Sequence, residues 1–175
     1  MSDKYHPLQT LADLMTLHEH FDGQLRGKTL AWVGDGNNVL HDLMVGALKS
    51  GMNVRVAAPA SHPADADVVQ AAKAISVELG VELLFTHDPS EAVRGADVVV
   101  TDTWVSMGQE GETGRRKADF DGYQVTAALM AKAAPGAVFL HCLPRKPDEV
   151  TDEVRADDDL SSCTCFTLLL VPSLR

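Results

Sequence analysis

The sequence has few of the features that mark secreted, membrane or nucleic-acid-binding proteins. Its three cysteines, Cys142, Cys163 and Cys165, are too few for a disulfide framework, which favours a reducing compartment. No apolar run approaches the roughly 18 residues of a membrane span, and the N-terminus has neither the Arg-rich nor the apolar character of a targeting peptide. The net charge of -10 argues against nucleic acid as a partner, because binding a phosphate backbone requires a basic face.

What is present is an alternation of apolar runs and helix-like segments. Hydrophobic residues make up 45% of the 175 residues, enough for the core of one ordinary domain. Helical spacing and capping signals predict helices at 6–21, 37–52, 65–80, 90–96 and 122–136. Short apolar runs predict strands at 28–33, 53–59, 82–88, 97–104 and 137–144. This order predicts an α/β fold, a three-layer open parallel sheet of about five strands with helices on both faces.

Polar clusters follow three of the predicted strands. They read GDGNN at 34–38, DTWVSMG at 102–108 and HCLPR at 141–145. Ligands of open parallel sheets bind beyond the carboxyl ends of the strands, and all three clusters fall at that edge. The sequence therefore predicts a binding site there.

The GDGNN cluster does not fit a dinucleotide-binding loop. A G-x-G-x-x-G loop needs a third glycine where this chain has Val39, and the second strand ends without a carboxylate for a ribose. One interpretation is a tight turn followed by an Asn helix cap. The other is that Asn37 or Asn38 offers its amide to a polar small molecule.

The other two clusters supply acidic, hydroxyl and thiol groups. Asp102 suits a substrate ammonium group, although a loop-capping role is equally compatible with its position. A dyad of His141 and Cys142 is conceivable, but adjacent strand residues point to opposite faces, so they are poor partners. A buried structural Cys is the alternative, and the Leu143–Pro144 peptide is a candidate for the cis isomer.

No metal site is expected. A zinc site needs four grouped ligands, and the histidines of the HEH segment, His18 and His20, do not share a helix face. The charged segment 111–119 is predicted to be a mobile loop, with a lid as the alternative.

Four segments together resemble the ornithine carbamoyltransferase family: YHPLQTLAD, WVGDGNN, DTWVSMGQE and FLHCLPRKPDEV. The resemblance covers roughly residues 2–154 in the family's order. It implies the Rossmann-like second domain of aspartate/ornithine carbamoyltransferases, the one that binds ornithine. Aspartate carbamoyltransferases share the His-Pro-x-Gln segment but lack the SMG and HCLP signatures.

The resemblance also implies roles for particular residues. Those that match the family's carbamoyl phosphate contacts are His6, Gln9, Cys142 and Leu143. Those that match its ornithine contacts are Asn38, Asp102, Ser106 and Met107. The residues implied at the reacting centre are Cys142, Asp102 and His141.

The implied reaction is transfer of the carbamoyl group from carbamoyl phosphate to the side-chain amine of L-ornithine, giving citrulline and phosphate. The family uses no cofactor or metal, serves arginine biosynthesis and the urea cycle, and forms homotrimers. The expected location is the mitochondrial matrix in a eukaryote and otherwise the cytoplasm. Two alternatives are a carbamoyltransferase for a related amine, such as putrescine or acetylornithine, and a non-catalytic ornithine-binding or interaction module.

The sequence departs from the family pattern at both ends. Nothing in it matches the family's first domain with its phosphate-binding loop, so residues 1–154 are interpreted as an incomplete ornithine-binding domain. Residues 155–175 break the preceding alternation and resemble nothing in the family. We therefore expect a poorly packed tail, and a chain that is inactive by itself.

Overall fold

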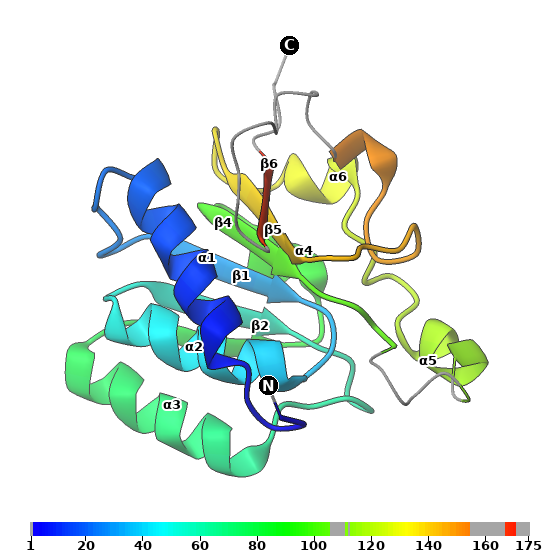
Figure 1. Ribbon diagram of the computed structural model, residues 1–175, viewed down its shortest axis with the longest axis horizontal. Coiled ribbons are helices and arrows are strands. Elements are labelled where there is room, and N and C mark those ends of the chain that lie inside the picture. Colours follow the sequence, from blue (N-terminus) through cyan, green and yellow to red (C-terminus); the bar gives the residue numbers. More distant parts are fainter. Residues whose placement is uncertain (1, 106–110, 112, 155–166, 171–175) are drawn as a thin grey trace.

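The fold is an open α/β sheet, seen in a computed structural model that describes residues 2–105, 111, 113–154 and 167–170 (Figure 1). Six strands lie in the order β3-β2-β1-β4-β5-β6. They span Thr29–Val33 (β1), Asn53–Ala57 (β2), Leu83–Thr86 (β3), Val98–Thr101 (β4), Val138–Cys142 (β5) and Thr167–Leu170 (β6). The helices are α1 Pro7–His20, α2 Asn38–Lys49, α3 Ala66–Leu79, α4 Pro89–Val93, α5 Thr113–Asp119 and α6 Ala127–Met130, with a short 3-10 helix η2 at Asp152–Val154.

Strands β1 to β5 are parallel, which confirms the predicted sheet. The sixth strand was not predicted. β6 pairs antiparallel with β5, so part of the segment expected to be a poorly packed tail forms backbone hydrogen bonds to the sheet edge. The rest of that tail lies outside the described residues, and its packing stays a prediction.

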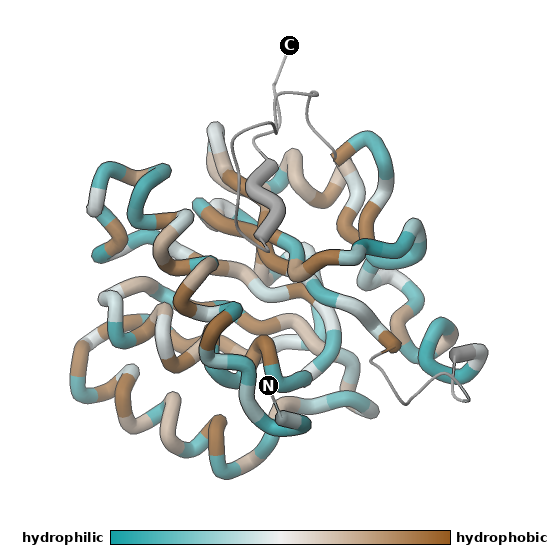
Figure 2. The backbone as a smooth tube through the Cα atoms, viewed as in Figure 1, coloured by the Kyte–Doolittle hydropathy of each residue, from teal (hydrophilic) through white to brown (hydrophobic). Residues whose placement is uncertain are grey.

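Side chains of β1 alternate between two hydrophobic cores. Leu30 and Trp32 belong to the core beneath α1, α2 and α3, whereas Ala31 and Val33 belong to the core beneath α4 and α6. Figure 2 shows hydrophobic stretches along these central strands. A strand buried on both faces reads as a continuous apolar run, which is why the sequence revealed it.

Two sequence interpretations are corrected by the fold. Residues 113–119, predicted to be a loop, form α5. The helix expected over 122–136 is confined to α6, and Val125 instead forms a parallel bridge with Val150. Among the described residues, no helix is both long and apolar enough to cross a membrane.

The carboxyl ends of β1, β4 and β5 lie side by side, since β4 pairs with both neighbours. The turn after β1 makes a close backbone approach: a Cβ on Gly36 would lie 2.3 Å from the backbone of Pro63 and Ala64. Glycine therefore allows the chain to pass there, and the turn delivers Asn37 and Asn38 to the edge where β4 and β5 end.

Candidate functional site

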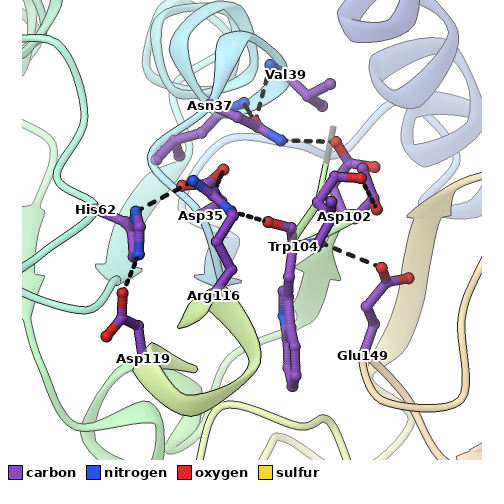
Figure 3. Close-up of polar contacts among 12 residues, drawn as sticks. Asp35, Asn37, Val39, His62, Asp102, Trp104, Arg116, Asp119 and Glu149 are labelled. Carbon is purple, nitrogen blue, oxygen red and sulfur yellow. Dashed lines mark hydrogen bonds and ion pairs between the residues drawn. The ribbon is translucent and has the colours of Figure 1, made fainter. Parts of the chain in front are cut away.

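Asp102 lies at the centre of this edge, directly after β4, and is 5% exposed. Asn37 Nδ2 donates to its Oδ2 at 2.8 Å (Figure 3). Burial raises the pKa of Asp102, while the Thr103 backbone N–H, His141 and Asn37 act in the opposite direction. A carboxylate with a raised pKa is a stronger base, so it accepts a proton more readily than a solvated carboxylate does.

The structure separates the roles of the two asparagines. Asn37 caps α2, its Oδ1 accepting from the backbone N–H groups of Val39 and Leu40, both at 3.1 Å. Its Nδ2 is directed at Asp102. Asn38 is the first residue of α2, and its Nδ2 donates to the Ser2 carbonyl at 2.7 Å.

His141 is fully buried and bound on both ring nitrogens. Nδ1 lies 2.9 Å from the Cys142 carbonyl oxygen, and Nε2 lies 3.2 Å from Glu149 Oε2. Glu149, 1% exposed, also accepts from the backbone N–H groups of Trp104 at 3.2 Å and Lys146 at 2.7 Å. Burial acts to raise the pKa of Glu149, but the hydrogen bonds from His141, the Lys146 backbone and Thr103 lower it.

Glu149 was missed by the sequence analysis. It follows Lys146, Pro147 and Asp148, a composition typical of an exposed loop. The available signals were its position shortly after the HCLPR cluster and within the FLHCLPRKPDEV segment.

Cys142 is half-buried and faces α1. Its Sγ donates to Gln9 Oε1 at 3.3 Å, and Gln9 Nε2 donates to Asp13 Oδ1 at 2.9 Å. Burial, followed by the charges of Asp102 and Asp13, raises the pKa of the Cys142 thiol to about 12. The thiol is therefore protonated at neutral pH and is not a thiolate nucleophile.

His6 caps the N-terminus of α1, three residues before Gln9. Its Nδ1 accepts from the Gln9 backbone N–H at 3.3 Å, and its own backbone N–H donates to the Asp42 carboxylate. A neutral imidazole that accepts at Nδ1 carries its proton on Nε2, so His6 has a donor to offer. Leu143, 48% exposed, follows β5 and precedes the cis peptide to Pro144. Ser106 and Met107 lie outside the described residues.

A second buried network joins α5 to the turn after β1. Arg116 pairs with the Asp35 carboxylate, donates to the Trp104 carbonyl and lies 3.3 Å from His62 Nδ1. His62 Nε2 lies 2.9 Å from Asp119 Oδ2 (Figure 3). Burial raises the pKa of Asp35, against the lowering effects of Arg116 and His62. The segment interpreted as a mobile charged loop is thus attached to the sheet edge by a buried Arg.

Metal-ligating residues do not converge in the part of the chain that the structure describes: no group of three or more His, Cys, Asp or Glu side chains is placed to hold an ion. A cavity of about 590 Å³ lies among α4, α6 and the segment after α5. Its lining includes Trp104 and Phe120 but not Asn38, Asp102 or Cys142.

Comparison with known proteins points to one family. Residues 26–165 match the family model described as aspartate/ornithine carbamoyltransferase, Asp/Orn binding domain. The mitochondrial ornithine carbamoyltransferase of Aquarana catesbeiana is 54% identical over 154 residues, which is 88% of this chain and 44% of the relative. The ornithine carbamoyltransferase of Carboxydothermus hydrogenoformans is 53% identical over 155 residues, which is 88% of this chain and 50% of the relative.

Solved structures give the same result. Ornithine carbamoyltransferase from Pyrococcus furiosus superposes with a TM-score of 0.82 at 44% identity, covering 87% of this chain and 49% of that one. The chain therefore spans about half the length of the relatives it matches.

Proposed function

Because the chain belongs to the aspartate/ornithine carbamoyltransferase family, we propose that it is the amino-acid-binding half of an ornithine carbamoyltransferase. That activity transfers the carbamoyl group of carbamoyl phosphate to the side-chain amine of L-ornithine, giving citrulline and phosphate, as in arginine biosynthesis and the urea cycle. The observation that carries the proposal is the convergence of Asp102, His141 and Cys142 at one sheet edge, each with a defined hydrogen-bond partner.

Ornithine binding is assigned to the edge between β1 and β4. Asn38 would hold the α-amino-acid end, and Asp102, with Ser106 and Met107, would complete the contacts. A buried carboxylate suits an ammonium group, because each charge-assisted hydrogen bond in a water-poor site is worth roughly 1.5–3 kcal/mol.

The reaction requires an uncharged amine. Asp102 and Cys142 would flank the amine. Because the pKa of Asp102 is raised, its carboxylate favours removal of a proton from the substrate ammonium group. The new N–C bond forms at the carbonyl carbon of carbamoyl phosphate, and the bond from that carbon to the phosphate oxygen breaks. His6 Nε2–H would stabilise the oxyanion, and Gln9 and Leu143 would position the carbamoyl group.

The phosphate needs cations that this half does not offer freely. Among described residues near the edge, Arg116 pairs with Asp35 and Arg145 pairs with Asp152. Lys146 Nζ donates to Thr103 Oγ1 at 3.0 Å and to the Val105 carbonyl at 3.1 Å. We therefore assign phosphate binding to the half of the family enzyme not represented here, within the homotrimer expected for the complete protein.

The relatives include one named as mitochondrial, from Aquarana catesbeiana, and one from Carboxydothermus hydrogenoformans whose name gives no location. For this chain we propose the mitochondrial matrix if its source is a eukaryote and the cytoplasm otherwise.

Calorimetric titration of the 175-residue chain with L-ornithine tests the proposal. Binding is expected, and Asp102→Asn, which preserves shape, should weaken it by about tenfold or more because an ammonium contact is lost. Asp121→Asn, an exposed carboxylate away from the edge, is the matched control. Stronger binding of putrescine or acetylornithine would support the related-amine alternative, and equal binding by wild type and Asp102→Asn would refute the assigned site.

A further inference from the structure

Asn37 has a side chain whose two ends are committed to different elements. Its Oδ1 accepts from two backbone N–H groups at the start of α2, and its Nδ2 donates to Asp102 after β4. Only the oxygen of an amide accepts hydrogen bonds, so the capping contacts determine which end carries the NH₂ group. The cap thereby aims a donor at the carboxylate.

Among the described contacts, Asn37 is the one side chain that donates a hydrogen bond to Asp102. Thr103 contributes a backbone N–H, which every substitution other than proline leaves in place. His141 has both ring nitrogens bound elsewhere, to the Cys142 carbonyl and to Glu149. The remaining titratable neighbours, Glu149, Cys142 and Asp35, donate no hydrogen bond to it in the contacts described.

Burial raises the pKa of Asp102, whereas the hydrogen bond from Asn37 lowers it. Asp102 is 5% exposed, and an unsupported buried carboxylate takes up a proton. A protonated Asp102 would neither attract an ammonium group nor accept its proton. Ionisation of Asp102 therefore depends on its hydrogen-bond donors, the Thr103 backbone N–H and Asn37 Nδ2.

We propose that Asn37 is a positioning residue that keeps Asp102 ionised and oriented toward the amine. The expected effect of Asn37 on ornithine binding rests on the proposed ornithine site. The expected effect of Asn37 on the ionisation of Asp102 does not. Asn37 belongs to the pattern GDGNN, and its amide is bound to α2 and Asp102, whereas its neighbour Asn38 is the residue assigned to ornithine.

The test measures Asp102 directly in the 175-residue chain. The ¹³Cγ resonance of Asp102, identified by its loss in Asp102→Asn, is followed by NMR against pH. Asn37→Ser retains a good helix cap but lacks the NH₂ donor, so its Asp102 midpoint should rise by about one pH unit. Asn37→Asp retains the cap and adds a carboxylate, so the midpoint should rise further.

Asn53→Ser is the matched control. Asn53 begins β2 at the opposite sheet edge, where its Oδ1 accepts from Glu82 N at 2.9 Å, so the Asp102 midpoint should not move. The wild-type chain gives a readout that needs no substitution: one Asn37 NH₂ proton should titrate with the same midpoint as Asp102. An unchanged midpoint in Asn37→Ser, or an Asn37 NH₂ signal that ignores Asp102, would overturn the proposal.

Ornithine binding separates this inference from the proposed function. If Asp102 titrates as expected while wild type does not bind L-ornithine, the positioning role stands and the ornithine assignment fails. If both hold, Asn37→Ser should bind L-ornithine as wild type does at high pH and more weakly as the pH falls toward its raised Asp102 midpoint.

Discussion

The Cys142 thiol keeps its proton because burial and two neighbouring carboxylates, Asp102 and Asp13, disfavour the thiolate. A neutral S–H can donate to Gln9 and pack beside an amine without competing as a nucleophile. The cysteine at the end of β5 is thus suited to shaping the proposed reacting centre, and a covalent intermediate at sulfur is not expected.

Alkylation of Cys142 by iodoacetamide should be slow in the folded chain. With a pKa of about 12 against an ordinary value of 9.0, the thiolate fraction at pH 8 falls about a thousandfold. The greater nucleophilicity of a more basic thiolate recovers part of this, leaving a rate about thirtyfold lower. Peptide mass spectrometry of the Cys142 peptide gives the rate, with the urea-unfolded chain as control. Equal rates in the two states would show that the thiol is not perturbed.

Glu149 is the residue whose loss should cost the fold most at this edge. Glu149→Ala would leave the buried His141 ring and the backbone N–H groups of Trp104 and Lys146 without their acceptor. The free energy of unfolding should fall by about 3–5 kcal/mol, as for other broken buried pairs. Urea denaturation measures it, and exposed Glu153→Ala should change it little. A loss as small as that of the control would mean that the edge is not organised around Glu149.

At the scale of elements, the turn between β1 and α2 depends on Gly36. Gly36→Ala would drive a Cβ into the backbone of Pro63 and Ala64, so the turn must shift and the chain should be destabilised by about 1–3 kcal/mol. Gly114→Ala in α5, where a Cβ meets nothing within 4 Å, should instead stabilise by about 0.5–1 kcal/mol. Thermal unfolding of both variants gives the sign of each stability change. If Gly114→Ala were destabilising and Gly36→Ala were not, the claim that the fold requires glycine at position 36 would be wrong.

The elements that sequence reasoning predicted are those with local signals. Buried strands read as apolar runs, and the strand-end clusters were placed at one edge by the general geometry of parallel sheets. What it missed is held by contacts distant in sequence. Arg116 reaches Asp35 from α5, and Glu149 reaches His141 from a polar loop. Both lie in charged stretches that resemble solvated loops, and no periodicity marks a side chain that turns inward to one partner.

The same limit applied to Asn37 and Asn38. Adjacent identical side chains gave the sequence no basis for choosing between a cap and a ligand contact. Backbone geometry assigns the cap to Asn37, because the residue before the first helical turn is the one whose side chain reaches the free N–H groups of α2. The ligand contact of Asn38 stays a prediction from the family resemblance.

For the whole molecule, the net charge of -10 opposes binding of a phosphate dianion. The cations at the site edge are already used within the fold, Arg116 and Arg145 by carboxylates and Lys146 by a hydroxyl and a carbonyl. Releasing Arg116 for substrate would leave the buried Asp35 carboxylate without its cation. The described residues therefore suit the proposed amino-acid substrate better than the proposed phosphate donor.

The purified 175-residue chain should consequently form negligible citrulline from carbamoyl phosphate and L-ornithine. Loss of several phosphate contacts, each worth roughly 1.5–3 kcal/mol, lowers the rate by many orders of magnitude at about 1.4 kcal/mol per tenfold. A colorimetric citrulline assay measures it, with the Carboxydothermus hydrogenoformans relative as positive control. Within a complete family enzyme carrying this half, turnover should return and Cys142→Ala should lower it. Turnover by the chain alone near 1 s⁻¹ or above, abolished by Asp102→Asn, would show that the 175-residue chain suffices for phosphate binding, because the second condition excludes a contaminating enzyme.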